Sequence, residues 1–404
     1  MAGDRTEDNL FQIPGQSQPD CAVPLVNRPP SSWKVMFVQE CNLRCGYCCT
    51  GHGSYGEGAL SMHPELWMRL SGLIVELAPP QSKVRIEFGG GETYLRFREA
   101  MLFLDRVRSL AAAKQIQVAA TILTNGTVAT PDQLQESLER KISLCFSIDG
   151  PAPRHDAFRT FANGRPTHHI ALETYRRYHA LVDGVTDPPG CTVSSVIAGD
   201  ARLAEVADFW REQGVKQFKA IPAEPSRFLE GQELEQWQRR RDSYLQDLKV
   251  LAFSEAERLV GRDFERAFEG PAGLLKSWVQ LKRGAPYQVC EAGYSVIAVD
   301  AVGTLFPCQG FIGFPERSIG DVHSGVNLAR LREFQESRFR VQSSCRGCWA
   351  RFLCEGGCCA GDPENDIVLN SWKGCEFSMA LVEIAVESYH RLQSHSAAAQ
   401  GSPA

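Results

Sequence analysis

Cysteine usage constrains this chain more than any other feature of its sequence. Fifteen cysteines occur in 404 residues, and the chain begins without the basic-then-apolar pattern of a signal peptide. Because thiols stay reduced inside the cell, so many cysteines predict metal binding rather than a disulfide framework. Four cysteines lie at residues 41–49 and eight more lie between residues 290 and 375, so two separate metal regions are expected.

The remaining composition indicates a folded protein of the cytoplasm. The net charge of -5 comes from 43 basic and 48 acidic residues without a long run of either sign. This balance argues against nucleic acid held by bulk electrostatics. The sequence also has no stretch of about 18 apolar residues that could cross a membrane. We therefore expect a cytoplasmic protein with neither a nucleic-acid nor a membrane partner.

Short apolar strands alternate with amphipathic helices through the first half of the chain. Strands are predicted at residues 33–38, 84–88, 116–123, 142–148, 192–197 and 216–221. Helical patterns between them, such as those that begin at Phe97 and Leu203, place apolar side chains on one face. This alternation predicts an α/β fold with a parallel sheet, in the form of an incomplete barrel with functional groups at the strand C-termini.

The sequence divides into five segments. Residues 1–31 are polar and proline-rich, which predicts a flexible N-terminal arm. Residues 32–230 hold the partial barrel, and residues 231–286 are rich in Arg, Glu and Leu at helical spacing, which predicts bridging helices. A small cysteine-rich domain with a C-terminal helix is expected over residues 287–392, followed by a disordered tail at 393–404.

The first cysteine cluster has the spacing of an iron–sulfur loop. Cys41, Cys45 and Cys48 follow a predicted strand in a C-x3-C-x2-C pattern, so one loop can place three thiolates around one inorganic cluster. A [4Fe–4S] cluster takes four ligands, so three thiolates leave one iron open to a small molecule. On spacing alone, an incomplete zinc site and a chance arrangement are alternatives.

This segment resembles the radical S-adenosylmethionine (SAM) superfamily, whose signature is the same spacing with an aromatic residue before the third cysteine, here Tyr47. The resemblance implies a partial (β/α)6 TIM-like barrel in which SAM binds the open iron. An electron from the cluster would then cleave SAM to methionine and a 5′-deoxyadenosyl radical. The protein would mainly support the chemistry of these cofactors.

The resemblance also implies SAM contacts at the ends of three further strands. A glycine-rich turn at residues 89–92 would meet the SAM amino group, because glycine permits close backbone approach. Arg159 would pair with the SAM carboxylate through its guanidinium fork. Each of these segments could also be an ordinary strand-ending turn. The cofactor-binding residues implied are Tyr47, Gly90, Gly91, Glu92, Asn125, Ser147, Asp149 and Arg159.

The second cysteine region forms one long motif. Its cysteines are Cys290, Cys308, Cys345, Cys348, Cys354, Cys358 and Cys375. Four of them alone could bind zinc in a ribbon. Together they resemble the SPASM domain, which implies two auxiliary [4Fe–4S] clusters and therefore three clusters in the chain.

By the same resemblance, the inner auxiliary cluster has the ligands Cys290, Cys308 and Cys358, and the outer one has Cys345, Cys348, Cys354 and Cys375. The inner cluster lacks a fourth cysteine at the usual place. Its fourth iron would be open to substrate, or would take an oxygen ligand or Cys359.

Two activities compete within this resemblance. Anaerobic sulfatase maturases oxidise a Cys or Ser of a sulfatase to formylglycine, and in them an Asp directly after the second SPASM cysteine acts as a base. Here that position is Gln309, and an amide is not a general base. We therefore expect a maturase that forms a thioether or carbon–carbon cross-link in a ribosomally made peptide, with sulfatase maturation as the alternative. The sequence assigns no catalytic residue.

The expected partners are a precursor peptide and a flavodoxin or ferredoxin that donates electrons. Only some 32 residues precede the first predicted strand. We therefore expect the peptide leader to be captured by the arm, by the barrel rim or by a separate leader-binding protein. Outside the enzyme class, the alternative is a non-catalytic iron–sulfur or zinc scaffold.

Overall fold

The computed structural model describes residues 29–215, 218–223, 234–258, 290–343, 348–350 and 375–400. Several sequence predictions fall outside these ranges: most of the N-terminal arm, the later bridging segment from residue 259, and the ligand positions Cys345, Cys354 and Cys358.

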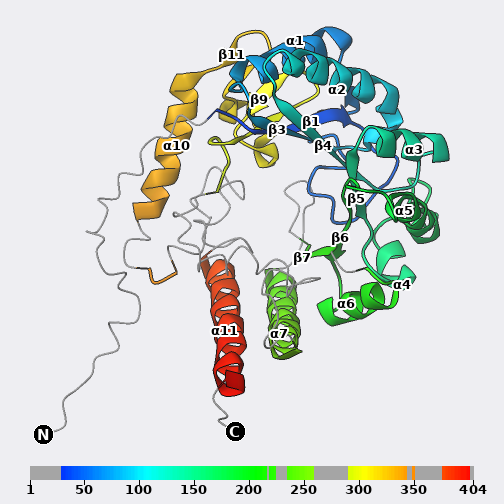
Figure 1. Ribbon diagram of the computed structural model, residues 1–404, viewed down its shortest axis with the longest axis vertical. Helices are drawn as coiled ribbons and strands as arrows, with labels where there is room; N and C mark the ends of the chain where they lie inside the picture. The colour runs from blue at the N-terminus through cyan, green and yellow to red at the C-terminus, as the bar shows by residue number, and fades with distance from the viewer. Residues whose placement is uncertain are drawn as a thin grey trace, which may run out of the picture.

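Six parallel strands form the centre of the structure (Figure 1). They are β1 (Ser32–Gln39), β3 (Lys83–Gly90), β4 (Gln117–Thr124), β5 (Ile142–Ser147), β6 (Cys191–Ile197) and β7 (Phe218–Pro222). Each pairs with the next in chain order, as expected for successive crossovers through helices. The predicted α/β fold with a largely parallel sheet is therefore confirmed.

The strands of the cysteine-rich segment extend this same sheet. β8 (Val296–Val299) pairs in parallel with β1, and β9 (Thr304–Phe306) and β10 (Gly320–Asp321) continue the sheet in antiparallel order. β11 (Gly325–Val326) closes that edge, and the two-residue β2 (Leu60–Ser61) pairs with the end of β1. The later segment therefore lies beside the strand that leads into the first cysteine cluster.

Helices cover the outer face of the sheet (Figure 1). They are α1 (Pro64–Leu77), α2 (Phe97–Ala112), α3 (Pro131–Glu139), α4 (Ala152–Asp156), α5 (His168–Val182) and α6 (Leu203–Glu212), with the 3-10 turn η1 (Thr93–Arg96) before α2. Alternate strand residues such as Ile86 and Phe88 pack into this layer, and α2 buries Met101 and Leu104 against them. Because strand side chains alternate between faces, Glu87 and Ser147 point to the opposite, concave face.

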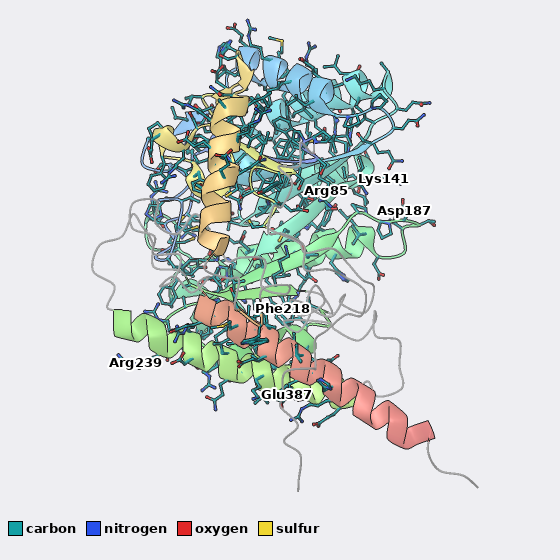
Figure 2. The ribbon with its side chains drawn as sticks, turned by 90° about the vertical axis from the view of Figure 1, so that its left-hand side faces the viewer. Arg85, Lys141, Asp187, Phe218, Arg239 and Glu387 are labelled. Carbon is teal, nitrogen blue, oxygen red and sulfur yellow. The ribbon has the colours of Figure 1, made fainter. Side chains whose placement is uncertain are left out.

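Two long helices lie side by side below the sheet (Figures 1 and 2). α7 (Leu234–Arg258) and α11 (Cys375–Gln400) are joined by ring contact between Tyr244 and Phe377 and by an ion pair between Glu257 and Arg391. The Tyr244 hydroxyl also donates to the Ala220 carbonyl at 2.7 Å, which attaches α7 to β7.

The remaining described elements are η4 (Gln309–Phe311), η5 (Pro315–Arg317) and α10 (Leu328–Ser343). None of the helices in the described part of the chain combines the length and hydropathy needed to cross a membrane.

Candidate functional site

A cavity of about 250 Å³ lies at the C-terminal ends of the parallel strands. Among the residues singled out from the sequence, it is lined by Cys41, Cys45, Cys48, Gly90, Gly91, Glu92, Asn125, Ser147, Arg159 and Gln309. These residues come from loops far apart in the chain. They meet because the C-terminal ends of parallel strands share one edge of the sheet.

The cysteine loop, residues 41–48, follows β1 and is attached to the segment after β5. The backbone N–H of Arg44 donates to the Thr160 carbonyl at 2.8 Å, and that of Gly46 donates to the Phe158 carbonyl at 2.9 Å. Leu43 and Phe161 add an isolated β-bridge. The loop that presents the three thiols is therefore held by backbone hydrogen bonds that it donates to a second loop.

Each of the three sulfurs accepts a hydrogen bond from an N–H group. The donors are Leu43 N and Asn125 Nδ2 for Cys41 at 3.5 and 3.7 Å, Arg159 Nη1 for Cys45 at 3.8 Å, and His52 N for Cys48 at 3.2 Å. Such donors stabilise negative charge on sulfur. Burial nevertheless raises the pKa of the Cys45 thiol to about 12 and also raises that of Cys41. Thiolates at these positions therefore need a compensating cation.

The donor set of the cavity is three thiols, which is the set that an iron–sulfur cluster with one open iron takes. In the ranges that the structure describes, no group of three or more His, Cys, Asp or Glu side chains is arranged to hold one metal ion. The three thiols instead line one cavity, together with the glycine-rich turn that begins at Gly89. A Cβ at Gly91 would lie 2.0 Å from the Glu40 carbonyl oxygen, and Gly90 has a φ of +93° that favours glycine. This donor set fits the three-thiolate site that the sequence predicts.

Glu92 contributes a buried carboxylate to the cavity wall. Its Oε1 accepts hydrogen bonds from Tyr94 N at 3.1 Å and from the Thr124 hydroxyl at 2.9 Å, and its Oε2 accepts from Asn125 N at 2.7 Å. These partners are all neutral. Burial raises the pKa of Glu92 to about 7 although the three hydrogen bonds oppose that rise. The carboxylate is therefore suited to a cationic group that enters the cavity.

Asp149 lies behind the wall and is engaged by the protein itself. Arg159 Nε donates to its Oδ2 at 3.0 Å, and the Tyr47 hydroxyl donates to the same oxygen. Val196 N donates to Oδ1 at 2.9 Å. The Arg159 guanidinium also lies over the Tyr47 ring, 5.3 Å from its centre. Of this buried group, Arg159 lines the cavity, so Asp149 and Tyr47 contact what lies there through Arg159.

His155 belongs to this arrangement, although it is not among the predicted site residues. Its Nδ1 accepts a hydrogen bond from Asp149 N at 3.3 Å, and its Nε2 lies 3.0 Å from the Thr167 hydroxyl oxygen. The Thr167 hydroxyl in turn donates to the Arg159 carbonyl at 2.6 Å. Burial lowers the pKa of His155 to about 3, so the ring is neutral and donates through Nε2. His155 lies six residues after Asp149 in the sequence, and this separation matches no local pattern that would predict the contact.

The cysteine-rich segment reaches the cavity through Gln309. The adjacent Cys308 and the earlier Cys290 are partly buried against an apolar cluster that includes Met36 and Tyr55, which also line the cavity. Cys348 is partly buried. Among the other predicted ligands, Cys345, Cys354 and Cys358 lie outside the described residues, and Cys375 is described only as the first residue of α11.

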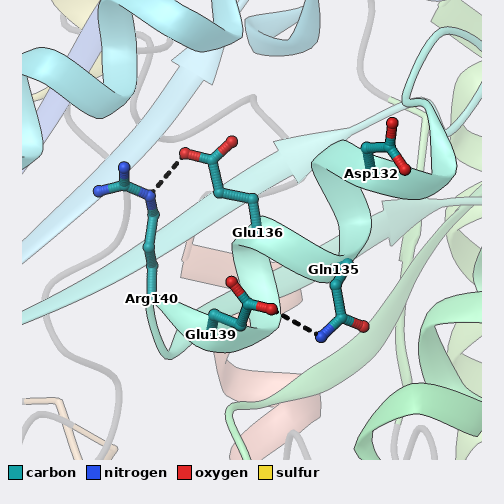
Figure 3. Close-up of a pocket in the computed structure, with 5 residues that line it drawn as sticks. All are labelled: Asp132, Gln135, Glu136, Glu139 and Arg140. Atoms are coloured by element: carbon teal, nitrogen blue, oxygen red, sulfur yellow. Dashed lines mark hydrogen bonds and ion pairs between the residues drawn. The ribbon is translucent and has the colours of Figure 1, made fainter.

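A second hollow lies on the outer face of α3, away from the strand ends (Figure 3). It is lined by Asp132, Gln135, Glu136, Glu139 and Arg140. Their polar groups bond to one another, as between Arg140 Nε and Glu136 at 2.7 Å and between Gln135 and Glu139 at 2.9 Å. This hollow contains none of the predicted site residues, and its side chains form the polar surface of an amphipathic helix.

Comparison with known proteins agrees with this geometry. Residues 35–196 match the family model of the Radical SAM superfamily. The chain is 23% identical over 377 residues to the cysteine-type anaerobic sulfatase-maturating enzyme of Clostridium perfringens (strain 13 / Type A), which covers 85% of this chain and 93% of the relative.

A serine-type anaerobic sulfatase-maturating enzyme of Bacteroides thetaiotaomicron is likewise 23% identical over 346 residues, covering 79% of this chain and 80% of the relative. Among solved structures, native anSMEcpe with bound AdoMet and the Cp18Cys peptide has a TM-score of 0.69 at 19% identity. That alignment covers 91% of this chain and 99% of the other. At this identity the likeness concerns the fold.

Proposed function

We propose that this chain, whose residues 35–196 form a radical SAM domain, is a maturase that removes two hydrogens from a residue within a polypeptide substrate. The observation that carries the proposal is that Gln309 lines the same cavity as Cys41, Cys45 and Cys48. A cavity bounded by both cysteine regions suits a reaction that starts at one cluster and delivers an electron to another.

The radical SAM family implies one [4Fe–4S] cluster and SAM. Cys41, Cys45 and Cys48 would hold the cluster. When bound, the cluster and SAM supply a 5′-deoxyadenosyl radical, which takes a hydrogen atom from the substrate. The proposed SAM contacts are Gly90, Gly91, Glu92, Asn125, Ser147 and Arg159, with Tyr47 and Asp149 acting through Arg159.

The residues of the chain bind and orient. Glu92 offers a carboxylate that has only neutral partners among the described residues, which suits the SAM amino group. Arg159 offers its guanidinium to the SAM carboxylate while Asp149 and Tyr47 keep it oriented. Glu92 and Arg159 are both buried, and charge pairing is stronger at buried groups than at the surface.

We further propose two auxiliary [4Fe–4S] clusters with the ligands assigned above by resemblance. The position of Cys290 and Cys308 against the apolar cluster beside the cavity supports an inner site close to the reacting residue. The second hydrogen of the substrate would leave as a proton and an electron, and these clusters would accept the electron. A flavodoxin or ferredoxin would supply the first electron, and the polypeptide would be held by the rim or by a separate leader-binding protein.

The names of the relatives indicate sulfatase maturation, for which the resemblance implies formylglycine as the product. Two sulfatase-maturating enzymes align over 79–85% of this chain, so sulfatase maturation is supported at least as well as the predicted cross-linking. The observation that favours cross-linking as a second candidate is Gln309, since its amide cannot accept the substrate proton. Both reactions require the same two-hydrogen oxidation and differ in the step that follows.

The test uses the anaerobically reconstituted enzyme with SAM and a reductant. A sulfatase-derived peptide with Cys or Ser at the modified position is analysed by mass spectrometry, in parallel with candidate precursor peptides encoded near the gene. An aldehyde in the first peptide supports sulfatase maturation, and a precursor lighter by two hydrogens without an aldehyde supports cross-linking. Failure to form 5′-deoxyadenosine with any peptide would contradict both.

Gln309 provides the matched comparison. Gln309→Asp restores a carboxylate at the position of the expected base, and Gln309→Asn keeps an amide of nearly the same size as the new acid. If the missing base limits aldehyde formation, only the Asp variant should increase it. Equal aldehyde yields in wild type and both variants would show that the proton leaves by another route.

A further inference from the structure

The side-chain amide of Asn125, directly after β4, lies against the sulfur of Cys41. Its Nδ2 is 3.7 Å from Cys41 Sγ and 2.9 Å from Asn42 Oδ1. The Asn125 residue is only 7% exposed. Buried amide hydrogens must be directed at acceptors, so the direction in which this amide points has consequences for the sulfur.

The orientation of the Asn125 amide is determined by its partners. Its Oδ1 accepts hydrogen bonds from Thr127 N at 2.9 Å and from the Thr127 hydroxyl at 2.6 Å, so the NH2 group must face the other way. Asn42 completes a ring, because its Nδ2 donates to Thr127 Oγ1 at 2.8 Å while its Oδ1 accepts from Asn125. One Nδ2 hydrogen of Asn125 therefore goes to Asn42, and the second is left for the sulfur of Cys41.

The backbone N–H groups of Asn125 and Gly126 are also hydrogen-bonded. Asn125 N donates to Glu92 Oε2 at 2.7 Å, and Gly126 N donates to the Thr124 hydroxyl at 3.0 Å. The donor is therefore present before any electron arrives and needs no rearrangement to act on the sulfur.

We propose that Asn125 donates a hydrogen bond to the Cys41 sulfur of the SAM cluster and thereby raises the reduction potential of that cluster. Reduction adds a negative charge that spreads onto the sulfurs, and a donor stabilises the more negative state. Asn125 is thus a positioning residue that acts through Cys41, which is a role distinct from the SAM contact predicted for it. The inference rests on the proposed cluster site.

The inference is tested by redox titration of the reconstituted full-length enzyme without SAM, followed by electron paramagnetic resonance. The SAM cluster is identified as the signal that changes when SAM is added. Asn125→Leu removes the donor at similar size, and Asn125→Asp keeps the acceptor for Thr127 but replaces the NH2 group by oxygen. Both should shift the potential of this cluster to more negative values, with the larger shift in the Asp variant.

Thr127→Val is the matched control. It removes the hydroxyl from the ring, but the Thr127 backbone N–H still holds Asn125 Oδ1 and so keeps the NH2 group toward Cys41. This variant should retain the wild-type potential. If Asn125→Leu shifts the potential no more than Thr127→Val does, the inference is wrong.

A second measurement uses the wild-type chain and does not depend on how a variant folds. Enzyme labelled with ¹⁵N in the side-chain amides of asparagine should show a weak ¹⁵N coupling to the reduced SAM cluster by pulsed electron paramagnetic resonance. Absence of that coupling would overturn the hydrogen bond. Failure of the proposed function has a different signature, because the wild-type enzyme would then show no cluster signal that responds to SAM.

Discussion

Glu92 and Asp149 are two buried carboxylates beside the same cavity, and they differ in their partners. Glu92 is 1% exposed and accepts hydrogen bonds from three neutral donors, whereas Asp149 is 2% exposed and pairs with the Arg159 guanidinium. A buried carboxylate without a cation is costly to ionise, and one that is paired within the protein is not available to a ligand. The difference assigns Glu92 to ligand binding and Asp149 to the orientation of Arg159.

The largest expected effect concerns the cysteine loop at the same cavity. Replacing Cys41, Cys45 and Cys48 together by Ala should remove the iron of one cluster and abolish 5′-deoxyadenosine formation, because no other site would chelate SAM. Iron analysis and chromatography of the SAM products measure both effects. The matched control is Cys49→Ala, since this neighbouring cysteine is exposed and should be dispensable. Residual SAM cleavage in the triple variant would show that the loop does not hold the SAM cluster.

The next effect is a loss of protein stability that is expected for Asp149 and its ion pair. Asp149→Ala leaves the buried Arg159 guanidinium without its partner, which should lower the free energy of unfolding by about 3 to 5 kcal/mol. Anaerobic denaturant unfolding of the reconstituted protein measures this loss. The double variant Asp149→Ala with Arg159→Leu removes the stranded charge and should recover part of the stability. If the single variant is as stable as wild type, the ion pair does not have the structural role inferred for it.

Glu92→Gln should weaken SAM binding. The variant removes the carboxylate charge and directs an NH2 group at a neighbouring donor, so SAM affinity should fall by roughly ten- to a hundred-fold, equivalent to about 1.5 to 3 kcal/mol. Iron content should remain at the wild-type level. Glu87→Gln is the matched control, because Glu87 lines the same cavity but is paired with Lys34 at 2.5 Å. Equal losses in both variants would contradict the assignment of Glu92.

The smallest effect is a pH dependence that Glu92 alone should impose. Because burial raises its pKa to about 7, the carboxylate gains a proton as the pH falls below about 7. SAM affinity should therefore decline toward lower pH, by no more than about tenfold per pH unit for a single proton, and Glu92→Gln should remove this dependence. Binding titrations from about pH 6 to pH 8 measure it.

The raised pKa of Glu92 has the opposite effect on the stability of the chain without SAM, which should fall as the pH rises. The unfolded chain releases the Glu92 proton near the usual value of 4.5, whereas the folded chain retains it up to about pH 7. Glu92 should therefore destabilise the fold progressively as the pH rises across this range and should add no further change above it. A wild-type stability that increases relative to Glu92→Gln between these values would contradict the inferred environment.

Local patterns were sufficient to predict the barrel strands and the thiol loop. Each of the six predicted strands is present with ends shifted by at most two residues, because a strand buried on its outer face must alternate or concentrate apolar side chains. The C-x3-C-x2-C spacing predicted that one loop would place three thiolates around one cluster; the structure places the three thiols at one cavity, because a short loop after a strand cannot separate them. Strand β8 was not predicted, because its four residues are too few to show a period.

Partner choice within the site could not be predicted in this way. Glu92 and Asp149 both follow a short apolar strand, and nothing local to either residue indicates that one meets Arg159 while the other meets only neutral donors. His155 was missed for the same reason, because its contacts with Asp149 and Thr167 depend on how the turn after β5 folds back on itself.

The sequence by itself determined the fold class and the cysteine loop, because apolar period and ligand spacing are local properties of the chain. Only the tertiary structure decided the use of each polar residue at the strand ends. β8 pairs with β1, so the segment that carries Cys308 and Gln309 meets the cysteine loop at one cavity. Hydrogen bonds and ion pairs between distant segments then determine which charged side chains are neutralised within the protein and which are available to a ligand. The distances between these segments are not encoded by any spacing along the chain.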